Sequence, residues 1–329
     1  MPVIESGLAW SGLARPQEST ASQGRQRRGL GLLIDLVALT RPLQWTKSLL
    51  VALIALATAP RWSAVGLTRV GWSALVLILA SAVVYVTNDI ADRDRDRGHP
   101  EKCRRPLASG RVDLVTAIVF AVLLAGVLCA AMAAGPSQPY WPVLAYVALN
   151  LAYSRGLKHL PLIDVGLIAT GFVLRLVQVT LAIGAGVSTW LLLAVFSLCL
   201  VLVLGKRRTE LLSAGAAHRP ALRGYTVAYL DHLIQLCCGL TVVSGLLYLD
   251  NGAPLDHDAA GATMVSLPLV LFGLSRYLQD MIVEREGADP VRTLVNDRPL
   301  VIAAALWVGW LGVVLVLAHN PSLVNQLFP

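Results

Sequence analysis

Apolar residues occur along this chain in long blocks, and short polar segments separate the blocks. Most blocks show neither a helical nor a strand period, and most are long enough to cross a bilayer as a helix of about 20 residues. We therefore predict an all-α, polytopic membrane protein with nine transmembrane helices. The first and fourth blocks are short. The predicted spans are residues 46–60, 68–88, 112–134, 140–154, 162–184, 189–205, 227–249, 263–281 and 299–319.

Residues 1–29 differ from the rest of the chain, because they are polar, rich in Ser, Gln and Arg, and contain no long apolar core. A secretory signal peptide requires such a core, whereas a polar segment of this composition favours disorder. We expect a disordered N-terminal tail over 1–29 and one transmembrane domain over 30–329. Residues 30–44 favour an interfacial helix that leads into the first span.

The charged residues are few and lie mainly on one side of the predicted membrane. Only 14% of the 329 residues are charged, against about a quarter in a soluble domain. All but three of the 27 Lys and Arg residues lie in the N-terminal segment or in the loops after spans two, four, six and eight. The positive-inside rule then places the N-terminus and these loops in the cytoplasm, and the C-terminus outside the plasma membrane. The net charge of +7 follows from this topology, and we predict no nucleic-acid partner.

The second span runs directly into an acidic segment, residues 88–96 (NDIADRDRD). On a helix, Asp89, Asp92 and Asp96 fall within about 60° of one another, whereas Asp94 points to the opposite side. Three carboxylates on one face repel each other unless a positive charge lies among them. Mg²⁺ prefers oxygen ligands and binds through one or two carboxylates plus substrate phosphates. The segment therefore predicts a Mg²⁺–diphosphate site at the membrane boundary.

Basic residues follow the acidic segment in the same loop, among them Lys102 and Arg105. Acids and bases together suit a site that holds a metal and an anionic substrate, although an ordinary positive-inside loop is the alternative. The sixth span likewise ends in Lys206 and Arg207, which are either site residues or a topology signal. Lys47 lies at the predicted interface, where it either anchors the chain or reaches a lipid phosphate.

Asp164 and Arg175 lie inside the fifth span, where ionisable residues are functional candidates by default. Eleven residues separate them, about three helical turns, so they share a helix face. Arg175 must therefore face a cavity, a carboxylate or a phosphate. The structural alternatives are a helix cap for Asp164 and a buried partner for Arg175. Gln178, one turn further on, could line the same cavity.

These features together resemble the UbiA superfamily of intramembrane prenyltransferases, from Arg41 to the last span. The family's first acidic motif, N-D-x-x-D-x-x-x-D, is complete here as Asn88, Asp89, Asp92 and Asp96. The resemblance implies a UbiA-like helical bundle around a central cavity. It also implies that this motif binds the Mg²⁺-diphosphate of the donor substrate.

Within the superfamily the chain is most similar to the decaprenyl-phosphate phosphoribosyltransferases. The shared patterns are RPxQWxK at 41–47, DxxHPxKxxRP at 96–106, YSxGLKH at 153–159 and GKRxxE at 205–210. Typical aromatic prenyltransferases of the superfamily carry a second acidic motif, D-x-x-x-D, after span six. Here that position is basic, which suits a donor and an acceptor that both carry phosphate.

The resemblance therefore implies a transferase that moves 5-phosphoribose from phosphoribosyl diphosphate to a polyprenyl (decaprenyl) phosphate in cell-wall arabinan precursor synthesis, with release of diphosphate. Its cofactor would be Mg²⁺, held by Asp89, Asp92 and Asp96. Its partners would be the membrane and the two substrates. The sequence leaves open whether the chain forms a homo-oligomer. The substrate-binding candidates are Lys47, Tyr85, Asn88, Lys102, Arg105, Tyr153, Lys158, Asp164, Arg175, Lys206 and Arg207.

Two alternative functions remain open from the sequence. A prenyl diphosphate:aromatic acceptor prenyltransferase of the quinone or haem O type is disfavoured by the basic residues 206–208. A transporter would line a pathway with its intramembrane charges. The chain contains no internal repeat, and its charges gather at one side without crossing, which disfavours a transporter.

Overall fold

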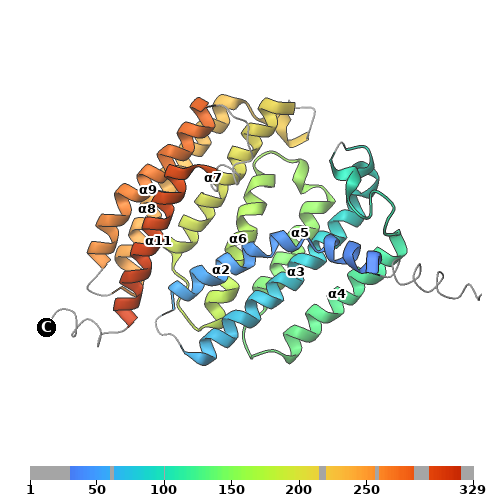
Figure 1. The fold of residues 1–329 in the computed structure, drawn as a ribbon, viewed down its shortest axis with the longest axis horizontal. Coiled ribbons are helices and arrows are strands. Elements are labelled where there is room, and N and C mark those ends of the chain that lie inside the picture. Colours follow the sequence, from blue (N-terminus) through green and yellow to red (C-terminus); the bar gives the residue numbers. More distant parts are fainter. Residues whose placement is uncertain are drawn as a thin grey trace, which may run out of the picture.

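The computed structural model describes residues 30–59, 63–99, 101–214, 220–255, 259–284 and 296–319. The predicted disordered tail over 1–29 lies outside these ranges, and one domain over 30–329 stays a prediction. Within the described ranges the chain is all-α, and nine helices of at least 12 residues form one bundle (Figure 1). These helices are α2 (Thr46–Ala57), α3 (Ala64–Arg97), α4 (Leu114–Ala134), α5 (Trp141–Arg155), α6 (Ile163–Ala182), α7 (Thr189–Ala214), α8 (Val227–Asn251), α9 (Ala259–Gln279) and α11 (Arg298–His319). Short helical turns lie between or beside them, namely η1 (Pro42–Gln44), η2 (Lys102–Arg104), η3 (Leu157–His159), η4 (Pro220–Gly224) and η6 (Asp280–Glu284).

Each predicted span corresponds to one of these nine helices, in the predicted order. Seven of the nine are long and apolar enough to cross a membrane, as far as the described residues show. The other two, α2 and α5, have 12 and 15 residues and fall short of the roughly 20 that a bilayer requires. They are the first and fourth predicted spans, whose apolar blocks were already short. Of these nine helices, seven are therefore candidate spans in the part of the chain that the structure describes.

Helix α3 is the longest element, with 34 residues, and it carries the acidic segment. Its N-terminus is capped by Ser63, whose side chain accepts a hydrogen bond from the backbone N–H of Gly66. The helix continues without a break past its apolar part, through Asp89 and Asp96, and ends just before Gly98. The helical placement of the acidic residues is therefore confirmed.

Two apolar cores meet at α6, which lies between the two halves of the bundle in Figure 1. The first core is formed by the five helices from α2 through α6 and includes the fully buried Leu77 and Leu176. The second core joins α6 to α7, α8 and α9 and includes Val165 and Ile234. Within a membrane, close van der Waals packing of such side chains holds the helices together, because lipid chains are as apolar as the protein interior. Polar side chains on α6 are therefore held on a helix that is packed on several sides.

The outer helices expose apolar side chains instead. On α4, Val115, Val122 and Leu123 are 70, 65 and 62% exposed. A continuous apolar surface of this kind is unfavourable in water but suits contact with lipid chains.

Residues 30–39 form a further helix, as the sequence predicted within 30–44. Its Leu33 and Ile34 side chains are exposed, whereas Leu39 is buried against α3 and α4. Asp35 of this helix pairs with Arg111 at 2.9 Å, which ties the segment to the loop after α3. The position of this helix at the membrane interface stays a prediction.

Candidate active site

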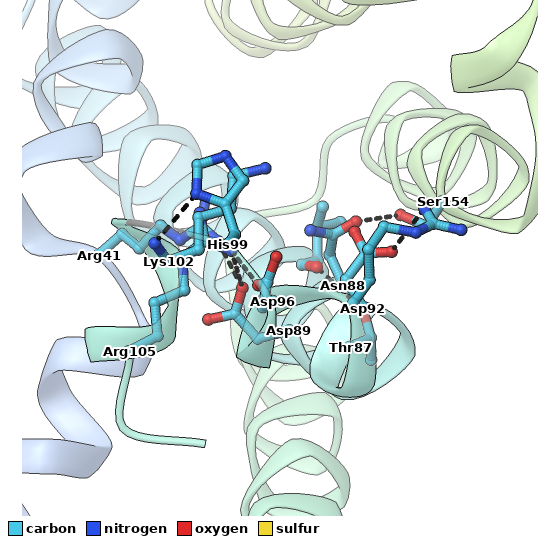
Figure 2. A network of polar contacts seen from close by, with 12 residues as sticks. Arg41, Thr87, Asn88, Asp89, Asp92, Asp96, His99, Lys102, Arg105 and Ser154 are labelled. Carbon is cyan, nitrogen blue, oxygen red and sulfur yellow. Dashed lines mark hydrogen bonds and ion pairs between the residues drawn. The ribbon is translucent and has the colours of Figure 1, made fainter. Parts of the chain in front are cut away.

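Asp89 and Asp96 lie two turns apart on α3, and both residues are 4% exposed. Arg105 lies against them, and its Nη1 donates to Oδ1 of Asp89 at 3.1 Å and to Oδ2 of Asp96 at 2.6 Å (Figure 2). One positively charged nitrogen therefore lies between two carboxylates. The structure brings these three predicted site residues together.

Arg41 is a site residue that the sequence reasoning missed. Its Nη2 donates to the same Oδ1 of Asp89, and its guanidinium lies 4.8 Å from the centre of the Tyr85 ring. The backbone of Arg41 is left-handed (φ 53°), although it is not glycine and precedes Pro42. Such a conformation costs about 1–3 kcal/mol and persists only where the surroundings enforce it. The signal in the sequence was a cation directly before a proline at the start of the first span.

Asp92 projects toward α5 and η3 rather than toward Arg105. Its two carboxylate oxygens accept from Lys158 Nζ at 2.6 and 2.7 Å, and the Lys158 residue is 8% exposed. The neighbouring Asn88 accepts a hydrogen bond from Ser154 Oγ at 2.8 Å. Figure 2 shows Asn88 and Asp92 on one side of the α3 end, and Asp89 and Asp96 on the other. The acidic segment thus presents two carboxylates together and a third beside them.

The described residues contain no group of three His, Cys, Asp or Glu side chains placed to hold one metal ion. A single ion shared by Asp89, Asp92 and Asp96 therefore stays a prediction. The pair Asp89 and Asp96 does fit Mg²⁺ chemically, because both supply carboxylate oxygens to one cationic nitrogen of Arg105. Mg²⁺ needs only one or two protein carboxylates when substrate phosphate completes its shell.

Arg175 lies deep in the bundle and is 5% exposed. Its Nη2 donates to Tyr146 Oη at 2.6 Å and to Ser81 Oγ at 3.2 Å, and its guanidinium lies 4.3 Å from the Tyr146 ring centre. No ion pair joins Arg175 to an acidic residue in the described part of the chain, and its buried Nε has no hydrogen-bond partner there. Gln178, one turn on, is fully buried and its amide also lacks partners among the described residues.

Lys47 lies near Arg175, and the charge of Lys206, an exposed residue at the end of the sixth predicted span, acts on Lys47. We call Lys47, Arg175 and Lys206 the cation cluster. Lys47 Nζ lies 5.8 Å and Arg175 Cζ 5.3 Å from the centre of the same Phe172 ring. Both Arg175 and Lys206 repel the Lys47 ammonium, and Arg41 adds to this repulsion. Among the described acidic residues none pairs with any member of the cluster. The cluster therefore has an unbalanced positive charge, which favours an anionic ligand.

Tyr85 lies between the acidic segment and the cation cluster. Its ring contacts Arg41, and Arg175 and Tyr146 are the other polar groups that act on its hydroxyl. That the two groups of residues form one site stays a prediction.

Asp164 and Arg207 form a second, buried network. Arg207 Nε donates to Asp164 Oδ2 at 2.8 Å, and Arg207 Nη1 donates to Glu210 at 2.6 Å. Tyr225 donates to Asp164 Oδ1 at 3.1 Å and accepts from the Leu162 backbone N–H at 2.6 Å. The helix cap considered as the structural alternative for Asp164 is not formed, because Leu162 is the N-cap of α6 and makes no side-chain cap hydrogen bond. Asp164 is instead held by an ion pair with Arg207 and a hydrogen bond from Tyr225, and direct substrate contact by Asp164 or Arg207 stays a prediction.

Lys102 and Tyr153 border the site. The backbone N–H of Lys102 donates to His99 Nδ1 at 3.4 Å, and the Lys102 residue is exposed. Tyr153, near the end of α5, is close enough to Arg207 for their charges to interact. Their contact with a substrate stays a prediction, as it does for the other candidates.

Known proteins resemble this chain over most of its length. The sequence profile of the UbiA prenyltransferase family matches residues 48–296. A decaprenyl-phosphate phosphoribosyltransferase of Mycobacterium tuberculosis is 32% identical over 292 residues, which cover 85% of this chain and 94% of that protein. Another, of Corynebacterium glutamicum, is 27% identical over 303 residues, which cover 90% of this chain and 91% of that protein.

Among solved structures, a UbiA homolog from Archaeoglobus fulgidus bound to GPP and Mg²⁺ has a similar fold. The TM-score is 0.65 at 19% sequence identity, and the match covers 86% of this chain and 99% of that one. At this identity the likeness shows the fold alone.

Proposed function

Because this chain belongs to the UbiA prenyltransferase family, we propose that it transfers 5-phosphoribose from phosphoribosyl diphosphate to a polyprenyl phosphate. As a member of the family it is an integral, multi-pass membrane transferase. In the proposed reaction a phosphate oxygen of the lipid attacks ribose C1. The bond from C1 to the diphosphate breaks, and its electron pair leaves with the diphosphate.

The acidic half of the site is proposed to take the donor. Asp89 and Asp96 would hold Mg²⁺ on the donor diphosphate, with Asp92 beside them, and the bound ion would neutralise charge that develops on the leaving group. Arg105 and Lys158 already lie against these carboxylates, so they are placed to bind phosphate oxygens with charge-assisted hydrogen bonds.

The cation cluster is proposed to take the phosphate of the lipid acceptor. Lys47 and Arg175 lie 5.8 and 5.3 Å from the centre of one aromatic ring and lack carboxylate partners among the described residues, and the charge of Lys206 also acts on Lys47. An unbalanced arginine at this depth costs several kcal/mol, which a bound phosphate would offset. This cluster is the observation that carries the proposal, because a phosphate has enough charged oxygens to bind several cations at once, whereas an aromatic acceptor such as 4-hydroxybenzoate offers a single carboxylate.

The chemistry then depends on positioning and electrostatics. The attacking group is already an anion, so no strong general base is needed, and the cations hold two phosphates close to one another despite their repulsion. The water-soluble donor would enter from the cytoplasm. That orientation follows from the Lys and Arg distribution and is part of the proposal.

Purified protein supplied with labelled phosphoribosyl diphosphate and decaprenyl phosphate tests the proposal, with mass spectrometry of the lipid product. We expect a phosphoribosylated lipid and no product from geranyl diphosphate with 4-hydroxybenzoate. The reverse pattern would instead establish an aromatic prenyltransferase. Asp89→Asn should abolish turnover, whereas Asp94→Asn is the matched control, since Asp94 is 89% exposed and pairs only weakly with Arg97 at 3.4 Å.

A further inference from the structure

Two arginines occupy the carboxylate oxygens that a divalent ion would use in the acidic half of the site. Arg41 and Arg105 both donate to Oδ1 of Asp89, and Arg105 also donates to Oδ2 of Asp96. Two carboxylates thus face two guanidinium groups. This group of four is neutral before any ligand enters.

The carboxylates are held more firmly than the arginines. The Asp89 and Asp96 side chains are 4 and 5% exposed and project from a continuous helix, whereas Arg41 and Arg105 are 27 and 28% exposed and come from connecting segments. Arg41 also contacts the Tyr85 ring, which gives its guanidinium a favourable contact that does not depend on Asp89. A ligand can therefore displace the arginines while the carboxylates stay in place.

A divalent cation alone is a poor ligand for such a site. It would add two positive charges to a neutral, largely buried group and would displace guanidinium groups that then have no anion to receive them. A cation bound to diphosphate instead brings net negative charge. Its phosphate oxygens bind arginine strongly, often in a bidentate manner, so they receive the arginines that the metal displaces.

We propose that Arg41 is a positioning residue that, together with Arg105, competes with the metal for Asp89 and makes metal binding depend on diphosphate. The inference rests on the proposed function in one respect, that the donor is a metal-bound diphosphate. By linkage, the factor by which diphosphate increases the affinity for the metal equals the factor by which the metal increases the affinity for diphosphate.

Mn²⁺, followed by electron paramagnetic resonance, is the metal probe, and inorganic diphosphate is the anion probe. Titrations of the full-length protein with and without diphosphate compare wild type with three variants. Arg41→Gln removes the charge that competes for Asp89, and Arg41→Lys retains it. Arg97→Gln is the matched control, because it removes one positive charge from the same end of α3, where Arg97 pairs with the exposed Asp94.

We expect Arg41→Gln to bind Mn²⁺ alone at least about tenfold more tightly than wild type. The increase in Mn²⁺ affinity that diphosphate causes should be smaller in this variant by a similar factor. Arg41→Lys and Arg97→Gln should behave as wild type. An unchanged affinity in Arg41→Gln, or an equal gain in Arg97→Gln, overturns the proposal. Arg105→Gln provides a second test with the same expectation if Arg41→Gln does not fold. The titration contains no sugar and no lipid, so the absence of phosphoribosyl transfer would refute the proposed function and leave this result standing.

Discussion

Breaking the buried ion pair between Asp164 and Arg207 tests how much this contact of α6 contributes to the stability of the fold. Asp164 is fully buried and the Arg207 side chain is 3% exposed. Asp164→Asn keeps the shape of the side chain and an acceptor for Tyr225, but it leaves Arg207 with Glu210 as its charged partner. Removing one partner of a buried pair costs about 3–5 kcal/mol, and because Glu210 remains we expect a loss at the lower end, about 3 kcal/mol.

Unfolding of the purified protein in one detergent, followed by tryptophan fluorescence, measures this loss. Glu210→Gln is the matched control, because it removes a charge from the same arginine at a position that is 21% exposed. We expect it to cost about 1 kcal/mol or less. The double variant with Asp164→Asn and Arg207→Gln removes the uncompensated charge and should be more stable than Asp164→Asn alone.

The same variants distinguish a structural role from substrate binding. If the pair is structural, Asp164→Asn lowers the unfolding midpoint, while the KM values of the folded protein stay near those of wild type. An unchanged midpoint combined with a raised KM would refute this reasoning and indicate that Asp164 contacts a substrate.

Three further predictions follow from the site. Lys47→Met should raise the KM for polyprenyl phosphate about tenfold or more, since a charged hydrogen bond contributes about 1.5–3 kcal/mol. Steady-state kinetics would contradict this role if the KM for the donor rose equally. Chelation of divalent cations should stop turnover and added Mg²⁺ should restore it, whereas activity that survives chelation would argue against the assignment of Asp89 and Asp96. Burial raises the pKa of Tyr225 to about 12, so its neutral form is favoured in the folded state, and its contribution to stability is complete below pH 10 and is lost as the pH rises through 12. An ultraviolet titration should show a late-ionising tyrosine in wild type that is missing in Tyr225→Phe, and identical curves would contradict the shift.

The acidic segment shows what the sequence could predict. Helical periodicity placed Asp89, Asp92 and Asp96 on one face. The structure places Asp89 and Asp96 against Arg105, a residue of the loop that follows, but Asp92 against Lys158. The partners of the other contacts, Arg41 for Asp89 and Lys158 for Asp92, come from distant segments. No local pattern specifies such pairs, because they depend on how the helices pack.

Helix α6 shows the same limit of prediction from sequence. The eleven-residue spacing puts Asp164 and Arg175 on one face of a continuous helix, and both are buried there. Their partners nevertheless come from different helices, Arg207 of α7 for Asp164 and Tyr146 of α5 for Arg175. Sequence periodicity predicts the face, whereas the neighbouring helices determine the contact.

Helix α3 also sets the spacing between the two halves of the site. Ser81, which bonds Arg175, and Asp89 lie eight residues apart on this unbroken helix, which corresponds to roughly 12 Å of helical rise. On the proposed function, ribose carbon and lipid oxygen must meet within that interval. The distance between the diphosphate of a donor and its reactive carbon then determines whether that donor reacts. A donor whose reactive carbon lies too far from the lipid phosphate is not attacked, however tightly its diphosphate binds.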